Sequence, residues 1–250
     1  MLKVENLHKS FGGVVATNDV SIDFPKESLC AVIGPNGAGK TTFFNLISGA
    51  LQPDSGQILL DGQNIVGKTS AEIVHMGIGR AFQVAKLFKT LTVEESLRGA
   101  LLSPLGKSAS LRGQFPLRET RDRAYEVMDQ LGLTSKANVV SGVLSHGDQK
   151  LLDMALALVL SPKVLLLDEP VAGMGPEERE QMIDTVYGLW KKGGLTIVLI
   201  EHDMEIVFRI SQNIHVLSYG RVLAEGTPDQ IRTNPDVIEA YLGSPKEADV

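Results

Sequence analysis

Residues 34–42 read Gly-Pro-Asn-Gly-Ala-Gly-Lys-Thr-Thr and fit the phosphate-binding pattern G-x-x-x-x-G-K-[ST]. Gly37 and Gly39 lack a Cβ, so successive backbone N–H groups can turn inward and surround an anion, and Lys40 adds a positive charge. An apolar run at 29–33 precedes the loop and a helical pattern follows it. The stretch therefore predicts an α/β fold with a polyphosphate held between a strand and a helix. An ordinary glycine-rich turn is the alternative, and kinases, GTPases and ATPases all stay open.

The composition limits the kind of protein that this chain can be. With 250 residues, of which 43% are hydrophobic, the chain can bury a large core, and its net charge of −6 argues against a broad nucleic-acid surface. The single cysteine, Cys30, cannot form an internal disulfide and fits a reducing cytosol. The most apolar stretch, residues 151–160, is too short to span a bilayer. We expect any role in membrane transport to depend on docking onto other, membrane-embedded chains.

Hydrophobic periodicity predicts three kinds of segment along the chain. Short alternating runs at 2–24, with a turn at 11–13, indicate antiparallel strands. Residues 70–76 and a segment opening at 91–95 read as helices, and the second begins with a capping box of Thr92 and Glu95. Residues 118–131 have the apolar spacing of an amphipathic helix. The proline- and glycine-containing segment 103–116 between these helices is expected to be an exposed loop.

A regular alternation of strands and helices resumes in the second half. We predict strands and helices in the following order: a strand at 163–168, a helix at 176–191, a strand at 195–200, a helix at 204–210, and a hairpin of 213–218 with 222–225. The predicted fold is an α/β core with a mainly parallel sheet, an N-terminal antiparallel β subdomain and an inserted α-helical subdomain. Residues 1–243 would form one domain, with core 1–90 and 160–243, helical subdomain about 91–159, and a flexible tail at 244–250.

Two carboxylates, Asp168 and Glu169, end a strand that is buried on both faces, where α/β folds bind their ligands. In a phosphate-loop enzyme the first can hold Mg²⁺ through water while Thr41 ligates the ion, and the second can polarise the attacking water. His202 follows the next strand and could donate a hydrogen bond to the γ-phosphate. The alternatives are a solvated acidic turn for the carboxylates and a surface histidine.

A second candidate anion site lies at residues 144–150, Leu-Ser-His-Gly-Asp-Gln-Lys, where a helix begins. Ser145 offers a hydroxyl and Gly147 a close backbone approach at a helix N-terminus. If each anion site is half of a pocket, two subunits arranged head to tail would close two nucleotides between them. The alternative is a plain helix cap made by Ser145 or Asp148.

Taken together, the motifs resemble those of the ATP-binding subunit of ABC transporters, over residues 4–243 and in that family's order. The matching segments are residues 34–42 (Walker A), Gln83 (Q-loop), 144–149 (signature), 164–169 (Walker B), 172–176 (D-loop) and His202 (H-loop). The resemblance implies an ATPase that binds ATP and Mg²⁺ and works as a dimer, with a second copy or a paralogue as partner. It also implies that Phe11 stacks on adenine, although an aromatic residue in a β-turn is often part of the core.

The expected site residues fall into three groups. Glu169, His202 and Lys40 are the expected catalytic residues, and Thr41, Gln83 and Asp168 the expected metal ligands. The nucleotide would be held by Phe11, Asn36, Gly37, Ala38, Gly39, Lys40, Thr41, Thr42, Gln83, Ser145 and Gly147. Gln83 would sense the γ-phosphate and pass the signal to a membrane partner through residues 84–102.

Within the family, the sequences of residues 77–83 and 225–228 look most similar to those of importers of branched-chain amino acids and related small amides such as urea. That resemblance implies separate permease subunits, an extracytoplasmic solute-binding protein, and a peripheral position on the cytoplasmic face of the inner membrane. The alternatives are a lipid or lipopolysaccharide exporter, a soluble ABC-type ATPase acting on nucleic acid or ribosomes, and a phosphate-loop kinase with a small-molecule acceptor.

Three residues depart from the family's usual pattern. His146 stands where the signature usually has glycine, Asp148 where it usually has glutamine, and Gly175 where the D-loop usually has an acidic residue. Asp148 places a carboxylate near an expected triphosphate, which costs electrostatic energy unless it points away and caps a helix beginning at Gln149.

Overall fold

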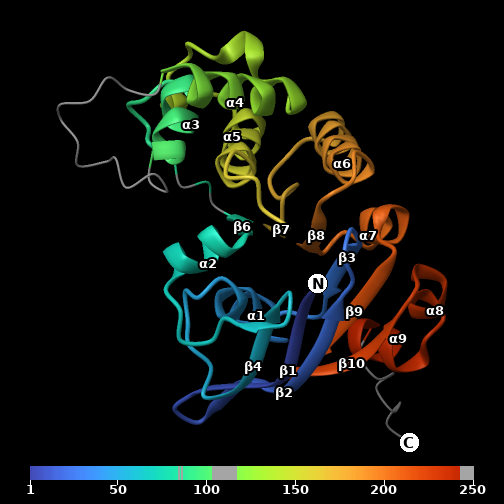
Figure 1. Ribbon diagram of the computed structural model, residues 1–250. Coiled ribbons are helices and arrows are strands. Elements are labelled where there is room, and N and C mark those ends of the chain that lie inside the picture. Colours follow the sequence, from blue (N-terminus) through green and yellow to red (C-terminus); the bar gives the residue numbers. More distant parts are fainter. Residues whose placement is uncertain (84, 86, 103–116, 243–250) are drawn as a thin grey trace, which may run out of the picture. The chain divides into compact units, whose positions relative to one another are not determined.

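The computed structural model of the protein describes residues 1–83, 85, 87–102 and 117–242 (Figure 1). The chain forms two compact units, the first from Met1–Ile73 with Thr196–Val250 and the second from Val74–Leu195. The predicted subdomain boundaries at 90/91 and 159/160 differ from these limits, and the division into a core and a helical subdomain stays a prediction. The exposed loop expected at 103–116 and the tail expected at 244–250 lie outside the described residues.

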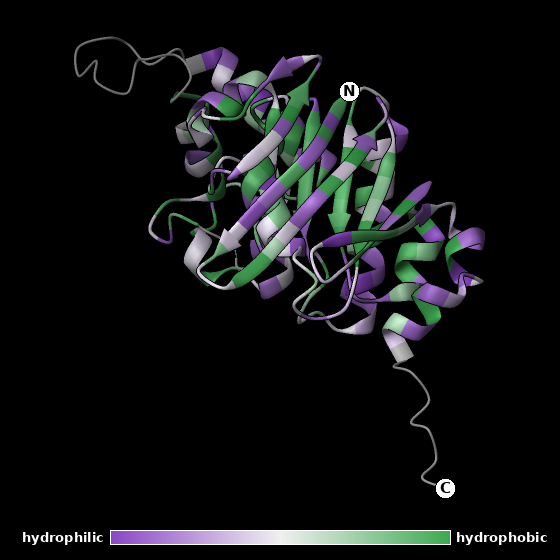
Figure 2. Ribbon diagram, turned by 90° about the horizontal axis from the view of Figure 1, so that it is seen from below, coloured by the Kyte–Doolittle hydropathy of each residue, from purple (hydrophilic) through white to green (hydrophobic). Residues whose placement is uncertain are grey.

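The first unit opens with the predicted antiparallel strands. β1 (Leu2–Phe11) pairs with β2 (Val14–Phe24) on one side and with β4 (Ser55–Leu60) on the other, and β5 (Gln63–Asn64) completes the order β2-β1-β4-β5. Buried and exposed residues alternate along these strands, and Figure 2 shows the matching bands of hydrophobic and hydrophilic residues. An antiparallel sheet of this kind can face the core on one side and solvent on the other.

A second, mainly parallel sheet in the first unit carries the phosphate loop. β3 (Leu29–Ile33) lies between β8 (Thr196–Ile200) and β9 (Asn213–Ser218), parallel to both, and β10 (Arg221–Gly226) is antiparallel to β9. Every residue of β3 and β8 is buried, as the continuous apolar runs predict. The unit's other helices are α1 (Lys40–Ile47), α7 (Met204–Ile210), α8 (Pro228–Arg232) and α9 (Pro235–Leu242).

The second unit combines two parallel strands with several helices. β6 (Ile78–Ala81) pairs with β7 (Val164–Asp168), from Ile78 opposite Val164 to Ala81 opposite Leu167. The helices are α3 (Val93–Leu102), α4 (Leu117–Gln130), α5 (His146–Leu158) and α6 (Pro176–Lys191), with short 3-10 turns η2 (Thr134–Lys136) and η3 (Ser141–Val143). α2 (Ser70–Met76) crosses the boundary between the units, with the predicted bounds.

Two local predictions in this unit are confirmed by the contacts of the helices. The capping box at α3 is present, because the Thr92 N–H donates to the Glu95 carboxylate at 2.9 Å and the Glu95 N–H donates to the Thr92 hydroxyl at 3.2 Å. On α4, the predicted apolar face is buried: Ala124, Val127 and Met128 are inaccessible to solvent. None of the helices in the described part of the chain has the length and hydropathy that a membrane span requires.

Candidate functional site

The phosphate-binding pattern forms the predicted connection between a strand and a helix. Residues 34–39 link the end of β3 to the start of α1. The Lys40 side chain is 7% exposed, and its Nζ donates to the carbonyl oxygens of Gly34 at 2.7 Å and Pro35 at 3.1 Å. The ammonium group is therefore held against the loop whose anion it is expected to neutralise.

Neighbouring strands crowd two glycines of this loop. A Cβ on Gly39, whose φ is 99°, would lie 2.2 Å from the carbonyl oxygen of Ala16 in β2. A Cβ on Gly34 would lie 2.1 Å from the carbonyl oxygen of Leu217 in β9. Gly37 has a left-handed φ of 81° but open space around it. The pattern thus needs glycine at 34 and 39 for space, in addition to backbone freedom.

We expect Gly39→Ala to weaken ATP binding by at least about tenfold, because left-handed strain of about 1–3 kcal/mol adds to a backbone clash that must displace the loop. Gly67→Ala is the matched control, since Gly67 is also left-handed (φ 84°) but has no atom within 4 Å of the added Cβ. Titration with a fluorescent ATP analogue and thermal unfolding would compare the two. Equal ATP affinity in both variants would contradict the crowding argument.

His202 and the phosphate loop follow adjacent strands. Because β3 and β8 are parallel, with Val32 opposite Ile200, their carboxyl ends lie side by side at one edge of the sheet. The exposed His202 comes two residues after β8, and Asp203 caps α7 by accepting from the N–H groups of Glu205 at 3.1 Å and Ile206 at 3.3 Å. The start of α7 thereby fixes the backbone at the histidine.

Phe11 ends β1, just before the turn at Gly12. The residue is 47% exposed, which rules out the alternative of a core aromatic residue. The Lys9 ammonium lies 5.6 Å from the ring centroid. The ring therefore has an accessible face, and its stacking on adenine stays a prediction.

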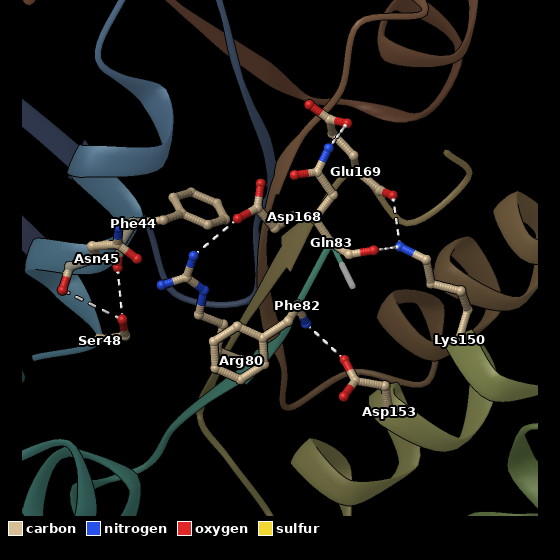
Figure 3. Close-up of polar contacts among 10 residues, drawn as sticks. All are labelled: Phe44, Asn45, Ser48, Arg80, Phe82, Gln83, Lys150, Asp153, Asp168 and Glu169. Atoms are coloured by element: carbon tan, nitrogen blue, oxygen red, sulfur yellow. Dashed lines mark hydrogen bonds and ion pairs between the residues drawn. The ribbon is translucent and has the colours of Figure 1, made fainter. Parts of the chain in front are cut away.

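The two carboxylates expected in the site, Asp168 and Glu169, have different surroundings, as Figure 3 shows. Asp168 ends β7, is 6% exposed and forms an ion pair with Arg80 of β6, with 2.9 Å between Oδ2 and Nη2. A solvated acidic turn is therefore wrong for Asp168. Glu169 is half-buried, and its Oε2 accepts from Gln83 Nε2 at 2.6 Å.

Arg80 is a site residue that the sequence argument missed. Its side chain is 7% exposed on a short, largely buried strand. A charged side chain is almost never fully buried unless it is paired, so an arginine among the apolar residues of 78–82 was the available signal. That signal indicates an acidic partner but does not name Asp168.

The signature segment begins α5 earlier than predicted. The helix starts at His146 with Ser145 as its N-cap, so a helix beginning at Gln149 is wrong. The Ser145 hydroxyl accepts from the Asp148 N–H at 3.2 Å and donates to the Asp148 carboxylate at 2.7 Å. The helix cap expected as the alternative is thus present, while the second anion site stays a prediction.

Lys136 forms an ion pair with Asp148 and so offsets the negative charge of that carboxylate. Its Nζ lies 2.5 Å from Asp148 Oδ1, and the aspartate is only 15% exposed. Asp148 therefore meets a positive charge on one oxygen and the Ser145 hydroxyl on the other. This pair reduces the negative charge that the segment presents to an anion, and no local sequence pattern marks Lys136 as the partner of Asp148.

The other two departures have local packing explanations. A Cβ on Gly173 would lie 3.2 Å from His146 Cε1, so the signature histidine packs against the D-loop at its glycine. Gly175 is the N-cap of α6, and its N–H donates to the Glu178 carboxylate at 3.4 Å. Glycine is an accepted N-cap residue, so the helix starts there without an acidic side chain.

Comparisons with known proteins agree with this architecture. The profile of the family described as "ABC transporter" matches residues 17–172, and that of "Branched-chain amino acid ATP-binding cassette transporter" matches residues 221–247. The chain is 41% identical to the high-affinity branched-chain amino acid transport ATP-binding protein LivG of Escherichia coli, over 97% of this chain and 98% of LivG.

Solved structures of ATP-binding cassettes resemble the fold over most of its length. An ABC transporter cassette in its ADP conformation is 34% identical, with a TM-score of 0.84 over 98% of this chain and 99% of that one. A dimeric bacterial ABC transporter cassette is 27% identical, with a TM-score of 0.78 over 91% of this chain and 99% of that one. Since the family profile covers more than half of the chain and the LivG match nearly all of it, the chain belongs to the ATP-binding subunits of ABC transporters and is an ATPase.

Proposed function

We propose that this ATPase powers the import of a branched-chain amino acid or a related small amide while docked on separate permease subunits. The observation that carries the proposal is the 41% identity to LivG over nearly the full length of both chains. The match of residues 221–247 to the branched-chain cassette profile supports the same substrate class. The system would include an extracytoplasmic solute-binding protein, and the chain would lie peripherally on the cytoplasmic face of the inner membrane.

In the proposed nucleotide site, the residues of the phosphate loop bind ATP. Lys40 and the backbone amides of residues 36–42 would hold the phosphates, and Phe11 would stack on the adenine ring. Thr41, Gln83 and Asp168 offer hydroxyl, amide and carboxylate oxygens, which are the hard donors that Mg²⁺ prefers. When bound, Mg²⁺ would neutralise charge on the phosphoryl oxygens.

Two groups would then act on the reacting atoms. Glu169 would orient and deprotonate the attacking water, and the hydrogen bond from Gln83 Nε2 fixes one of its carboxylate oxygens. His202, at the end of the strand beside the one that leads to the phosphate loop, would hold the γ-phosphate. Preorganised groups of this kind lower the barrier because they need no rearrangement as charge develops.

A complete site would require two subunits in a head-to-tail arrangement. The phosphate loop of one subunit would bind ATP, and Ser145 and Gly147 of the other would cover its γ-phosphate. The partner can be a second copy of this chain or a paralogue. A single subunit is then expected to bind ATP but hydrolyse it slowly.

Transport by a reconstituted system tests the proposal. The chain would be purified with the permease subunits and the solute-binding protein encoded beside it and placed in liposomes with ATP on the cassette side. We expect ATP-dependent uptake of labelled leucine, isoleucine or valine, and none with a Lys40→Ala cassette. Uptake restricted to urea would correct the solute within the proposed class, whereas ATP-driven efflux, or copurification with nucleic acid in place of permease, would refute the proposal.

A further inference from the structure

The signature helix α5 carries two buried charges on one face. Lys150 and Asp153 are each 5% exposed and lie three residues apart, so their side chains point to the same side of the helix. Charged groups are almost never this deeply buried unless they are paired or hydrogen-bonded. Neither residue has a part in the proposed hydrolysis described above.

Both charges bind the segment that carries Gln83. The Lys150 ammonium donates to the Gln83 carbonyl oxygen, and Asp153 Oδ2 accepts from the Phe82 N–H at 2.6 Å. Figure 3 shows the two side chains reaching from α5 to this segment from one side. The helix therefore holds the backbone of two successive residues just after β6, accepting from the N–H of Phe82 and donating to the carbonyl oxygen of Gln83.

The same ammonium also reaches the residue expected to be the catalytic base. Lys150 Nζ lies 3.3 Å from the Glu169 carbonyl oxygen. Gln83 Nε2 in turn donates to the Glu169 carboxylate at 2.6 Å. Lys150, Gln83 and Glu169 thus form a closed ring of contacts, in which the ammonium fixes the backbone of both other residues and the glutamine amide fixes the carboxylate.

The backbone of Glu169 needs such support. Its φ is 50°, in the left-handed region, although it is not a glycine, and the buried Pro170 follows it. A residue in this conformation costs about 1–3 kcal/mol and persists only where its surroundings hold it. An ammonium with three tetrahedrally arranged donors can bind two carbonyl oxygens at once, which an apolar side chain cannot do.

We infer that Lys150 is a positioning residue for hydrolysis: it holds the backbone of Glu169 and Gln83 so that the carboxylate stands where it can deprotonate the attacking water. The inference rests on the proposed role of Glu169. Lys150 would act mainly in the chemical step, because the phosphate loop expected to hold ATP is a separate segment of the chain. The loss of Lys150 should therefore lower kcat far more than it changes the affinity for ATP.

Lys150→Met is the direct test, because methionine fills a similar volume without a donor. We expect kcat to fall roughly 10- to 100-fold, the effect of a displacement of about 1 Å at a reacting group, while the Kd for ATP stays within about twofold. Lys191→Met, which removes an exposed ammonium from α6 of the same unit, should leave both values unchanged. Wild-type kcat for Lys150→Met, or a loss of ATP affinity equal to the loss of kcat, would overturn the inference.

A second variant and a double variant complete the test. If Lys150→Met does not fold, Lys150→Gln keeps two donors and should fold with a kcat about tenfold lower at unchanged ATP affinity; an unchanged kcat would overturn the inference. Adding Lys150→Met or Lys150→Gln to Glu169→Gln should change the residual rate by less than about twofold, because the group being positioned is gone. A full, multiplicative further loss would mean that Lys150 acts elsewhere.

The failure of this inference can be told from the failure of the proposed function. If Glu169→Gln alone hydrolyses ATP at the wild-type rate, the proposed base is wrong. If Glu169→Gln is inactive while the Lys150 variants retain wild-type kcat, only the positioning role is wrong.

Discussion

Replacing Glu169 with glutamine is expected to slow ATP hydrolysis by roughly two to four orders of magnitude, the usual contribution of a general base. The substitution preserves the size of the side chain and removes the charge that would take a proton from water. ATP should still bind, because the phosphate loop is untouched. Steady-state phosphate release and equilibrium binding of an ATP analogue would measure the two properties separately.

The same variant should accumulate as an ATP-bound dimer, since hydrolysis would no longer separate the subunits. Size-exclusion chromatography with and without ATP would detect it. Glu177→Gln, in the exposed first turn of α6, is the matched control and should hydrolyse ATP normally. Glu169→Gln with near-normal hydrolysis and no ATP-dependent dimer would assign the base to another group.

Replacing Ser145 with arginine is expected to abolish both ATP-dependent dimerisation and hydrolysis while each subunit still binds ATP. The serine hydroxyl caps α5 through the Asp148 N–H, and its loss alone costs about 0.5–2 kcal/mol of stability. The longer side chain would occupy the space in which the partner's nucleotide is expected. Dimerisation would be measured by size exclusion in the Glu169→Gln background, and hydrolysis in the otherwise wild-type chain.

Ser135→Arg makes the same replacement at an exposed serine of η2 in the same unit and should dimerise and hydrolyse ATP normally. Thermal unfolding of both variants would separate the loss of the helix cap from the loss of the interface. If Ser145→Arg hydrolysed ATP and dimerised like the wild type, the shared nucleotide site would be wrong.

Local sequence patterns predicted most elements of the fold because their causes are local. α2, α6 and α7 have the predicted bounds, and at α6 Pro176 fixes the first turn. The start of α5 was predicted wrongly because Ser145 and Asp148 are both good N-cap residues, and hydrophobic periodicity does not decide which of them begins the helix. A helix boundary depends on which side chain reaches an unpaired N–H, a matter of one hydrogen bond.

The contacts that organise the candidate site could not be predicted in the same way. The sequence marks Arg80 and Lys150 as charges beside apolar residues, but their partners Asp168 and Gln83 are 88 and 67 positions away. A charge pattern indicates that a partner exists, and only the folded chain selects it. The phosphate loop was predictable because its residues form one continuous segment. Lys136, Arg80 and Lys150 instead pair with residues that are distant in the sequence.

The position of Ser145 at the start of α5 has a consequence for how much ATP unpartnered subunits hydrolyse in a cell. Ser145 at its cap and Lys150 lie five residues apart, an axial rise of about 7.5 Å on a rigid helix. If the cap meets the neighbouring subunit's ATP, a lone or wrongly paired subunit leaves its own nucleotide without a cap, although its Lys150 already holds its own base. Unpartnered subunits would then consume little ATP, even where the protein is produced in excess.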